Sequence, residues 1–250
     1  MTPPSSLELV ALAAAGLAAS VLNVIAGGGS FLTLPMLIFF GLPPTEANAT
    51  NRLGVLAQNA AGVFGFHRHR VLDWPFAMRA SVPALAGAVL GTWLALHVGD
   101  REFRRILAIL MLAISLLTIF RVGDRMAARL GGAPHRRGFL AMGFFAAGVY
   151  AGFVQAGVGF LVLALTTLAG LDFVRGNAVK VFVILLTTTV SLALFVAGGT
   201  VHWLPGAALA AGSLAGSLVG VRLTVLKGHA FVRLVVTVTI LVFAVLLWRG

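Results

Sequence analysis

The chain is built from apolar runs separated by short polar stretches, with five runs in each half. The polarity of these runs does not alternate from residue to residue, so the pattern predicts helices rather than the strands of a barrel. A helix needs about 20 residues to cross the roughly 30 Å of hydrocarbon in a bilayer. We therefore predict an all-α polytopic membrane protein. The runs cover about 7–26, 29–41, 52–66, 77–96 and 104–120, then about 139–155, 158–171, 181–196, 204–223 and 231–248.

The second run of each half is too short for an easy crossing. In the first half it follows Gly27, Gly28 and Gly29, and in the second half it follows Gly157. A glycine-rich break between apolar runs leaves backbone N–H groups free at membrane depth, where only protein or a water-filled cavity can receive them. Interrupted segments at corresponding places in two halves indicate a transporter's binding site. Each short segment either crosses by itself or dips in with the run before it, as a re-entrant hairpin.

The two halves align as an internal repeat. A shift of 129 residues places 41–94 on the second half without a gap, so that Asn48 meets Asn177. With one residue dropped, the segment 27–32 falls on the segment 157–161, and glycines coincide in both copies. The feature around the first break is therefore predicted to occur twice.

Each half contains an odd number of segments, so the second repeat should be inverted relative to the first. We predict an N-terminal repeat over 1–120, a cytoplasmic linker over 121–138 and a C-terminal repeat over 139–250, together forming one transmembrane domain. Placing the linker in the cytoplasm puts thirteen Lys and Arg residues inside and five outside, as the positive-inside rule expects. Both termini are then predicted to lie outside the cell membrane.

Composition narrows the function. The chain is 60% hydrophobic and 10% charged and has no cysteine, so thiol chemistry and cysteine-bound metals are excluded. Its net charge of +11 comes from basic residues in short loops, which favours contact with the lipid bilayer over contact with nucleic acid. The six histidines form no metal-binding pattern, and the sequence has no nucleophile–base pattern. We therefore expect no catalytic residue, no metal, no cofactor and no enzymatic activity.

Small residues recur at four-residue spacing in two of the runs. Gly87 and Gly91 share one helix face, and so do Gly212, Gly216 and Gly220. Such faces let helices approach one another closely. Packing within the bundle is the preferred interpretation, and the seam of a homodimer is the alternative.

The motifs around the first break resemble a known family. AGGGSFLTLP places a proline in the short run after the glycines, a Gly-Leu-x-Pro turn follows, and the next helix opens with an Ala-x-x-Asn-type entry. With the degenerate second copy GVGF, these features resemble the TauE/SafE family of membrane permeases over essentially the whole chain. The resemblance implies a secondary transporter that exports a small sulfur-containing anion, such as sulfite or an organosulfonate. A permease for another small anion such as a carboxylate is one alternative, and a non-transporting membrane scaffold or assembly factor is another.

The breaks are the leading candidates for the anion site. Free N–H groups and partial positive charge at helix N-termini suit the oxygen atoms of sulfite or a sulfonate. The alternative is that the glycines only allow the helices to cross tightly. The residues concerned are Gly27, Gly28, Gly29 and Ser30 in the first half, with Gly157 and Gly159 in the second.

Polar residues next to the breaks are further candidates. Asn23 and Gln155 precede the two breaks and either line a cavity or cap freed backbone groups. Asn51 and Asn177 follow the short runs. Like Asn48 and Thr50, they either line the site or act as N-caps of the following helices.

Four more residues complete the candidate site. Arg52 and Lys180 stand at the starts of apolar runs. Snorkelling to the lipid headgroups is the structural interpretation, and for Lys180 the functional one is that it balances the anion's charge from the inner side. Gln58 and Asn59 lie deeper in the third run and either line the path or form hydrogen bonds between helices.

These residues suggest a mechanism in which the two breaks meet near the bilayer midplane and both direct N–H groups at one anion. One half, or a gate, then rocks against the other. All seven carboxylates lie near run ends or in loops, so we expect no buried carboxylate for coupling to protons or sodium. An exported anion can instead follow the membrane potential, which is worth about 2.3 kcal/mol per charge per 100 mV.

Overall fold

The computed structural model describes residues 4–25, 27–119 and 136–249. Every regular element in these residues is an α-helix, which confirms the all-α prediction. Most of the predicted linker 121–138 lies outside the described residues. The helices are α1 (Ser6–Ile25), α2 (Ser30–Phe39), α3 (Pro44–Arg68), α4 (Trp74–His97), α5 (Asp100–Ile119), α7 (Arg136–Phe153), α8 (Val158–Leu168), α9 (Phe173–Ala197) and α10 (Trp203–Arg249).

Length and surface composition identify a multi-pass membrane protein. Among the described helices, α1, α4, α9 and the part of α10 up to Leu226 are long and apolar enough to cross a bilayer. Large apolar side chains also stand on the outside of the bundle, for example Val82, Phe64 and Leu226. Such a surface is unfavourable in water but matches the hydrocarbon of a membrane.

Two helices begin earlier than the apolar pattern predicts. α3 starts at Pro44, with Pro43 before it as the N-cap residue, because proline's fixed φ suits the first position of a helix. α9 starts after Asp172, whose carboxylate accepts two backbone N–H bonds of 2.9 Å. The polar residues Asn48, Thr50, Asn51 and Asn177 therefore lie inside helices. Their interpretation as N-caps is wrong.

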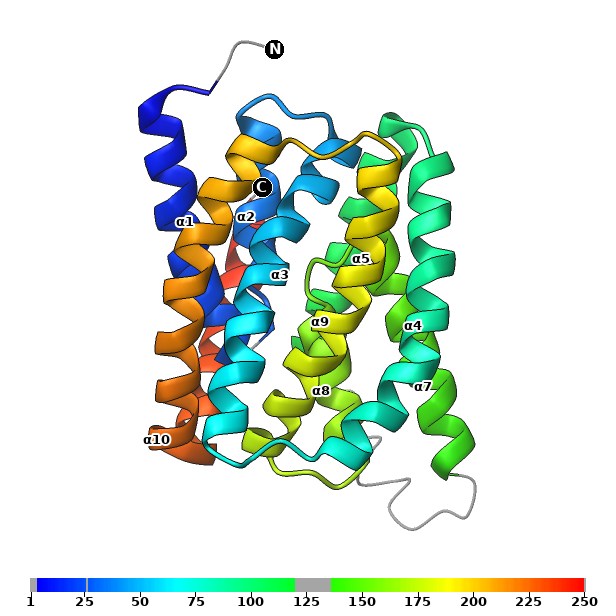
Figure 1. Cartoon of the computed structure of the whole chain (residues 1–250), viewed down its shortest axis with the longest axis vertical. Coiled ribbons are helices and arrows are strands. Elements are labelled where there is room, and N and C mark those ends of the chain that lie inside the picture. Colours follow the sequence, from blue (N-terminus) through cyan, green and yellow to red (C-terminus); the bar gives the residue numbers. More distant parts are fainter. Residues whose placement is uncertain (1–3, 26, 120–135, 250) are drawn as a thin grey trace.

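The short segments belong to two hairpins. α2 has 10 residues and α8 has 11, so each is about 15–17 Å long at 1.5 Å per residue. In Figure 1, α1 and α2 form a hairpin with its open end at the top, whereas the hairpin of α7 and α8 opens at the bottom. This arrangement agrees with the re-entrant alternative.

The helices pack in two groups, and each group contains one helix from the other half of the sequence. α1 makes its most extensive contact with α10, and α7 makes its most extensive contact with α4. We call α1, α2, α3 and α10 the first bundle, and α4, α7, α8 and α9 the second bundle. The fourth helix of each half thus packs with the other half, and α3 meets α9 where the bundles adjoin. In Figure 1 α10 descends beside α1, and its red C-terminal part rises behind.

The glycine faces make the exchanged contacts possible. A Cβ on Gly87 or Gly91 of α4 would lie 2.1 or 1.9 Å from a backbone oxygen of α7. A Cβ on Gly212 or Gly216 of α10 would lie 1.8 or 2.2 Å from a backbone oxygen of α1. The interpretation of these glycines as packing residues within the bundle is confirmed. A homodimer would have to use another surface.

We expect Gly87→Ala to lower the free energy of unfolding by about 1–3 kcal/mol, the usual cost of overpacking. The added methyl group would lie 2.1 Å from the Phe145 carbonyl oxygen, so α4 and α7 would have to separate. Gly138→Ala is the matched control, because a Cβ there meets no atom within 4 Å. Thermal unfolding in detergent measures the difference, and equal midpoints for the two variants would contradict the close-packing argument.

Candidate functional site

The two glycine-rich breaks lie against each other. A Cβ on Gly27 would lie 2.5 Å from the carbonyl carbon of Gly159, and a Cβ on Gly159 would lie 2.4 Å from the Cα of Gly27. Just beyond these glycines, the rings of Phe31 and Phe160 stack with their centroids 6.3 Å apart. The breaks therefore meet inside the bundle, as the repeat in the sequence predicts. Their role in binding an anion stays a prediction.

Both breaks use left-handed backbone conformations. Gly27 has φ 101° and Gly157 has φ 77°, which glycine adopts without a steric penalty. Gln155 also has a positive φ of 66°, which is uncommon for a residue with a side chain. Its amide donates to the Thr188 hydroxyl at 2.5 Å, and the nearby Tyr150 hydroxyl donates to the Ala156 carbonyl. Side-chain hydrogen bonds therefore hold the second break in place.

Lys180 caps the helix that precedes the first break. Its Nζ donates to the carbonyl oxygens of Asn23 and Val24 at 2.9 Å each and to Oδ1 of Asn177 at 2.5 Å. The carbonyl groups in the last turn of a helix lack partners within it, and the negative end of the helix dipole favours a cation. Because Lys180 is buried inside the bundle, its interpretation as a snorkelling residue is wrong. We call this arrangement the first cap.

Arg52 and Asn48 make the corresponding contacts before the second break. Arg52 donates through Nη2 to the Gly152 carbonyl at 2.6 Å, and Asn48 donates through Nδ2 to the Phe153 carbonyl at 2.8 Å. The Arg52 guanidinium also lies 4.8 Å from the centre of the Phe195 ring, a distance at which a cation is attracted to an aromatic face. Arg52 is fully buried, so snorkelling is wrong for it too. We call this arrangement the second cap.

The two caps place positive charge inside the protein without a matching carboxylate. Every carboxylate in the described residues is at least partly exposed, whereas Arg52 and Lys180 are 0% and 1% exposed. Removing a charge from water costs several kcal/mol per ion, and the carbonyl dipoles of the caps offset only part of that cost. The Nε and Nη1 atoms of Arg52 have no hydrogen-bond partner in the described part of the chain. The interior around the breaks therefore favours an anion.

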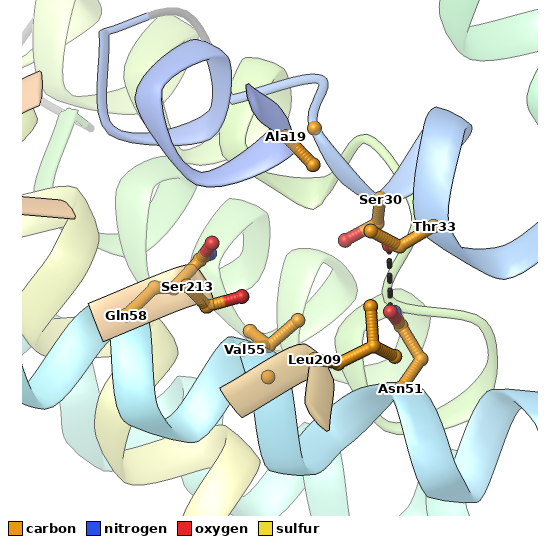
Figure 2. Close-up of a pocket in the computed structure, with 10 residues that line it drawn as sticks. Ala19, Ser30, Thr33, Asn51, Val55, Gln58, Leu209 and Ser213 are labelled. Carbon is orange, nitrogen blue, oxygen red and sulfur yellow. Dashed lines mark hydrogen bonds between the residues drawn. The ribbon is translucent and has the colours of Figure 1, made fainter. Parts of the chain in front are cut away.

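A cavity lies beside the first break (Figure 2). Its volume is about 10 Å³. That is about the room that one water needs, so a larger guest requires the surrounding helices to move. All its walls belong to the first bundle, so the cavity lies to one side of the breaks rather than between them. It is lined by Ala19, Gly29, Ser30, Thr33, Asn51, Gly54, Val55, Gln58, Leu209 and Ser213.

The cavity wall offers hydrogen-bond donors. The Thr33 hydroxyl donates to Oδ1 of Asn51 at 2.7 Å, which leaves the buried Nδ2 of Asn51 as the end of the amide without a partner among the described residues. Figure 2 shows this pair across the cavity from Ser213. Gly29, which also lines the cavity, has an N–H group without a backbone acceptor among the described residues. Donors of this kind suit the oxygen atoms of an anion.

The structure divides the predicted residues among several places. Gly29, Ser30, Asn51 and Gln58 line the cavity. Asn59 donates to the Val55 carbonyl within its own helix, and its place on a transport path stays a prediction. The other predicted residues lie at the caps or breaks: Asn23, Asn177 and Lys180 at the first cap, Arg52 at the second cap, Gly27, Gly28, Gly157 and Gly159 in the breaks, and Gln155 beside Thr188.

Two polar residues of the cavity are absent from the predicted set. Thr33 lies three residues after Ser30 in α2, a spacing that places both on one helix face, so that spacing was a usable signal. Ser213 follows Gly212 in the glycine-rich part of α10 and recurs four residues later as Ser217, a spacing that places both serines on one helix face but does not show what that face contacts. It reaches the cavity only because α10 packs with the other half.

Known proteins that resemble this chain are named as membrane transporters. A "Probable membrane transporter protein" of Haemophilus influenzae is 29% identical over 236 residues, which cover 92% of this chain and 90% of that protein. "Probable membrane transporter protein YfcA" of Escherichia coli strain K12 is 30% identical over 234 residues, covering 92% of this chain and 86% of the relative. "Probable membrane transporter protein ORF9" of Sinorhizobium sp is 26% identical over 242 residues, covering 95% and 91%. No solved structure matches the chain.

The match to a protein family agrees with these relatives and with the helical architecture. It extends over residues 12–247, and so includes both breaks, both caps and the cavity. The relatives are named as transporters, and not as enzymes. This chain belongs to the family described as "Sulfite exporter TauE/SafE", and it is a multi-pass membrane transporter of that family.

Proposed function

We propose that this transporter exports a small sulfur-containing anion, sulfite or an organosulfonate, across the cell membrane by alternating access, holding it at the glycine-rich breaks. The observation that carries the proposal is the pair of buried cations, Arg52 and Lys180, without a buried carboxylate in the described residues. Basic residues at membrane depth are costly and mark ion pathways. The family description, which names sulfite, supports the choice of substrate.

The orientation follows from the charges at the two ends of the bundle. The end of α3, the loop after it and the start of α9 lie at the lower end of Figure 1. Their basic residues include Arg68, Arg70 and Arg175, whereas α5 begins at the upper end with both acidic and basic residues. We place the lower end in the cytoplasm and both termini outside. Arg52 and Lys180 are buried, so they no longer belong to the count of basic residues in loops. One is removed from the outside and one from the inside, and the excess of basic residues inside remains.

We also propose that 1–120 and 139–250 are inverted repeats joined by a cytoplasmic linker over 121–138. The hairpins of the two halves open at opposite ends of the bundle in Figure 1. The exchange of α4 and α10 is reciprocal, and so are the two caps. A two-fold axis in the membrane plane would relate such pairs.

The bodies that move are the two bundles rather than the two halves of the sequence. Close glycine contacts join α1 to α10 and α4 to α7, so a motion that separated the halves would break both. Between the bundles lie the α3–α9 contact, the two breaks and the two caps. Rocking at this interface would rearrange the two caps, whereas the cavity beside the first break, whose walls all belong to the first bundle, widens only by movement within that bundle.

Purified protein in liposomes should release trapped sulfite faster when the interior is made electrically negative. An anion that leaves a negative compartment gains about 2.3 kcal/mol per charge per 100 mV. The measurement is sulfite efflux at potentials clamped with potassium and valinomycin, with and without a proton gradient, and empty liposomes are the control. Efflux that ignores voltage and follows the proton gradient would overturn potential-driven export. Absence of flux for sulfite and sulfonates, with flux for carboxylates, would overturn the substrate class.

Lys180→Gln should weaken anion binding at least tenfold, because the variant keeps a donor at the first cap but removes the buried charge. Lys180→Arg should retain most of the affinity. Arg79→Gln removes an exposed charge near the cytoplasmic end and is the control, with a change of less than twofold. Sulfite titrations read as thermal shifts measure both affinity and stability. A less stable Lys180→Gln protein with unchanged affinity would restrict Lys180 to a structural cap.

Two engineered disulfides distinguish moving bundles from moving halves. A Cβ on Gly62 would lie 3.6 Å from the Val181 Cβ, within the usual range for a disulfide, and this pair joins the two bundles. A Cβ on Gly65 would lie 3.2 Å from the Val221 Cβ, and this pair joins the two halves inside the first bundle.

The chain has no cysteine of its own, so each pair can be introduced without background. Oxidation of Gly62→Cys/Val181→Cys should stop sulfite flux, and a reductant should restore it. Oxidation of Gly65→Cys/Val221→Cys should leave flux unchanged, because its partners move together. If both disulfides stop flux, the halves move and the bundle proposal is wrong.

A further inference from the structure

The residues that line the cavity beside the first break have mates in the second half, and the repeat identifies them. From Phe31 onward the halves align with a shift of 129 residues. Burial supports this register, because buried positions of α2 fall on buried positions of α8 and exposed positions fall on less buried ones. Phe31 and Phe160, which are mates in this register, stack on each other. The cavity residues can therefore be compared one by one with their mates.

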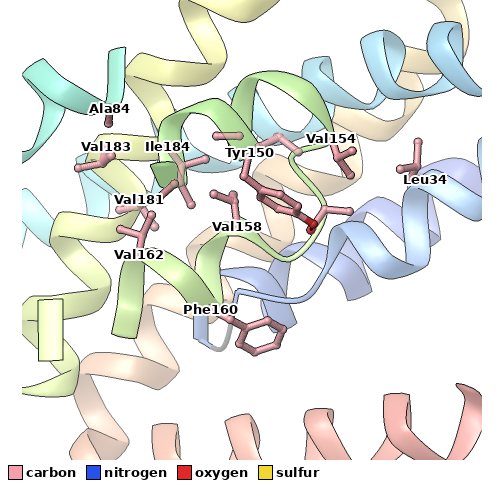
Figure 3. Close-up of a cluster of buried hydrophobic side chains, with 14 of the residues drawn as sticks. Leu34, Ala84, Tyr150, Val154, Val158, Phe160, Val162, Val181, Val183 and Ile184 are labelled. Atoms are coloured by element: carbon pink, nitrogen blue, oxygen red, sulfur yellow. The ribbon is translucent and has the colours of Figure 1, made fainter. Parts of the chain in front are cut away.

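Three of the cavity residues have apolar mates. Thr33 corresponds to Val162 and Ser213 corresponds to Ala84, so two hydroxyl groups are replaced by methyl or hydrogen. Gly54 corresponds to Val183, so a side chain stands where the first copy has none. Figure 3 shows Val162, Val183 and Ala84 in one cluster of buried hydrophobic side chains, and each is 1–2% exposed. The second copy is packed where the first copy is hollow.

Asn51 and its mate Lys180 differ in whether their side-chain donors have acceptors. In the first copy its Nδ2 is buried at the cavity wall and has no partner in the described residues. Its mate is Lys180, which points away to the end of α1 and has three acceptors there. The unused donor of the pair is thus in the first copy. A buried donor without a partner indicates a ligand or an ordered water.

The charge of the first cap also lies close to this cavity. Gly29 lines the cavity, and a Cβ on it would lie 2.8 Å from the Asn23 Cβ. The Asn23 carbonyl in turn accepts from Lys180. A cation thus lies behind a wall made of neutral donors, and this arrangement attracts an anion without forming a tight ion pair with it.

We infer that the transporter has one anion site per chain, at the cavity of the first break, and that the equivalent place in the second copy is closed by the apolar side chains of Val162, Val183 and Ala84. This inference rests on the proposed anion transport and narrows it to one of the two breaks. Asn51, Ser30 and Gln58 donate hydrogen bonds to the oxygen atoms of a sulfite or sulfonate group. Thr33 is a positioning residue, because its hydroxyl holds Oδ1 of Asn51 and so directs Nδ2 into the cavity.

The test exchanges residues between the two copies. Thr33→Val and Ser213→Ala give the first copy the residues of the second, and Val162→Thr and Ala84→Ser are the reciprocal controls. Thr33→Val and Ser213→Ala should each weaken sulfite and ethanesulfonate binding about tenfold, because the first removes the hydrogen bond that orients the Asn51 amide and the second removes a hydroxyl group from the cavity wall. The controls should change affinity less than twofold. Isothermal titration of the purified wild-type chain should give one anion per chain.

Each outcome has a separate meaning. If the wild-type chain binds none of these anions, the proposed function fails, whatever the variants do. If it binds them but the four variants bind equally well, anion transport survives and the site assignment is overturned. Two anions per chain, or equal losses in both pairs, would overturn the single site. Asn51→Asp is a second probe, because a carboxylate at the cavity wall should abolish binding, and the unfolding midpoint of each variant separates lost binding from lost folding.

Discussion

A helix that ends inside a membrane leaves its last carbonyl groups without donors, because lipid offers none. α1 ends at Ile25 and α7 ends at Phe153, both before a glycine-rich break in the interior of the bundle. Lys180 supplies donors to the first of these ends, and Arg52 with Asn48 supplies them to the second. Each donor comes from a helix of the opposite bundle. Contact between the bundles therefore stabilises both breaks.

The choice of cations for this task has an electrostatic consequence. Amide side chains alone could donate to the same carbonyl groups and would leave the interior neutral. Lys180 and Arg52 instead leave two positive charges at depth, and the described residues hold no buried carboxylate near them. The carbonyl groups and the Phe195 ring offset part of the cost. The groups that stabilise the broken helices thus also favour a negatively charged guest.

The sequence predicts the breaks well and their surroundings poorly. Gly27 and Gly157 interrupt long apolar runs, and only a few conformations suit such a feature in a membrane. The early start of α3 at Pro44 was missed, because the polar residues inside the helix ended the apolar run. The cap made by Lys180 was not predictable, since a sequence does not show which carbonyl groups a lysine will reach. Ser213 was missed because the packing of α10 against the other half is a tertiary contact.

Duplication does not require both copies to keep the same chemistry. Once one copy holds the guest, polar and empty positions in the other only destabilise it, and burying a valine side chain stabilises a fold by about 1.5–3 kcal/mol. Gly54 and Val183 stand at equivalent places with different surroundings, since Gly54 lies in the wall of the cavity and Val183 lies among packed apolar side chains. The second bundle is then the rigid frame. The first bundle, with a cavity and an unpaired donor in its interior, is the part that can deform around a guest.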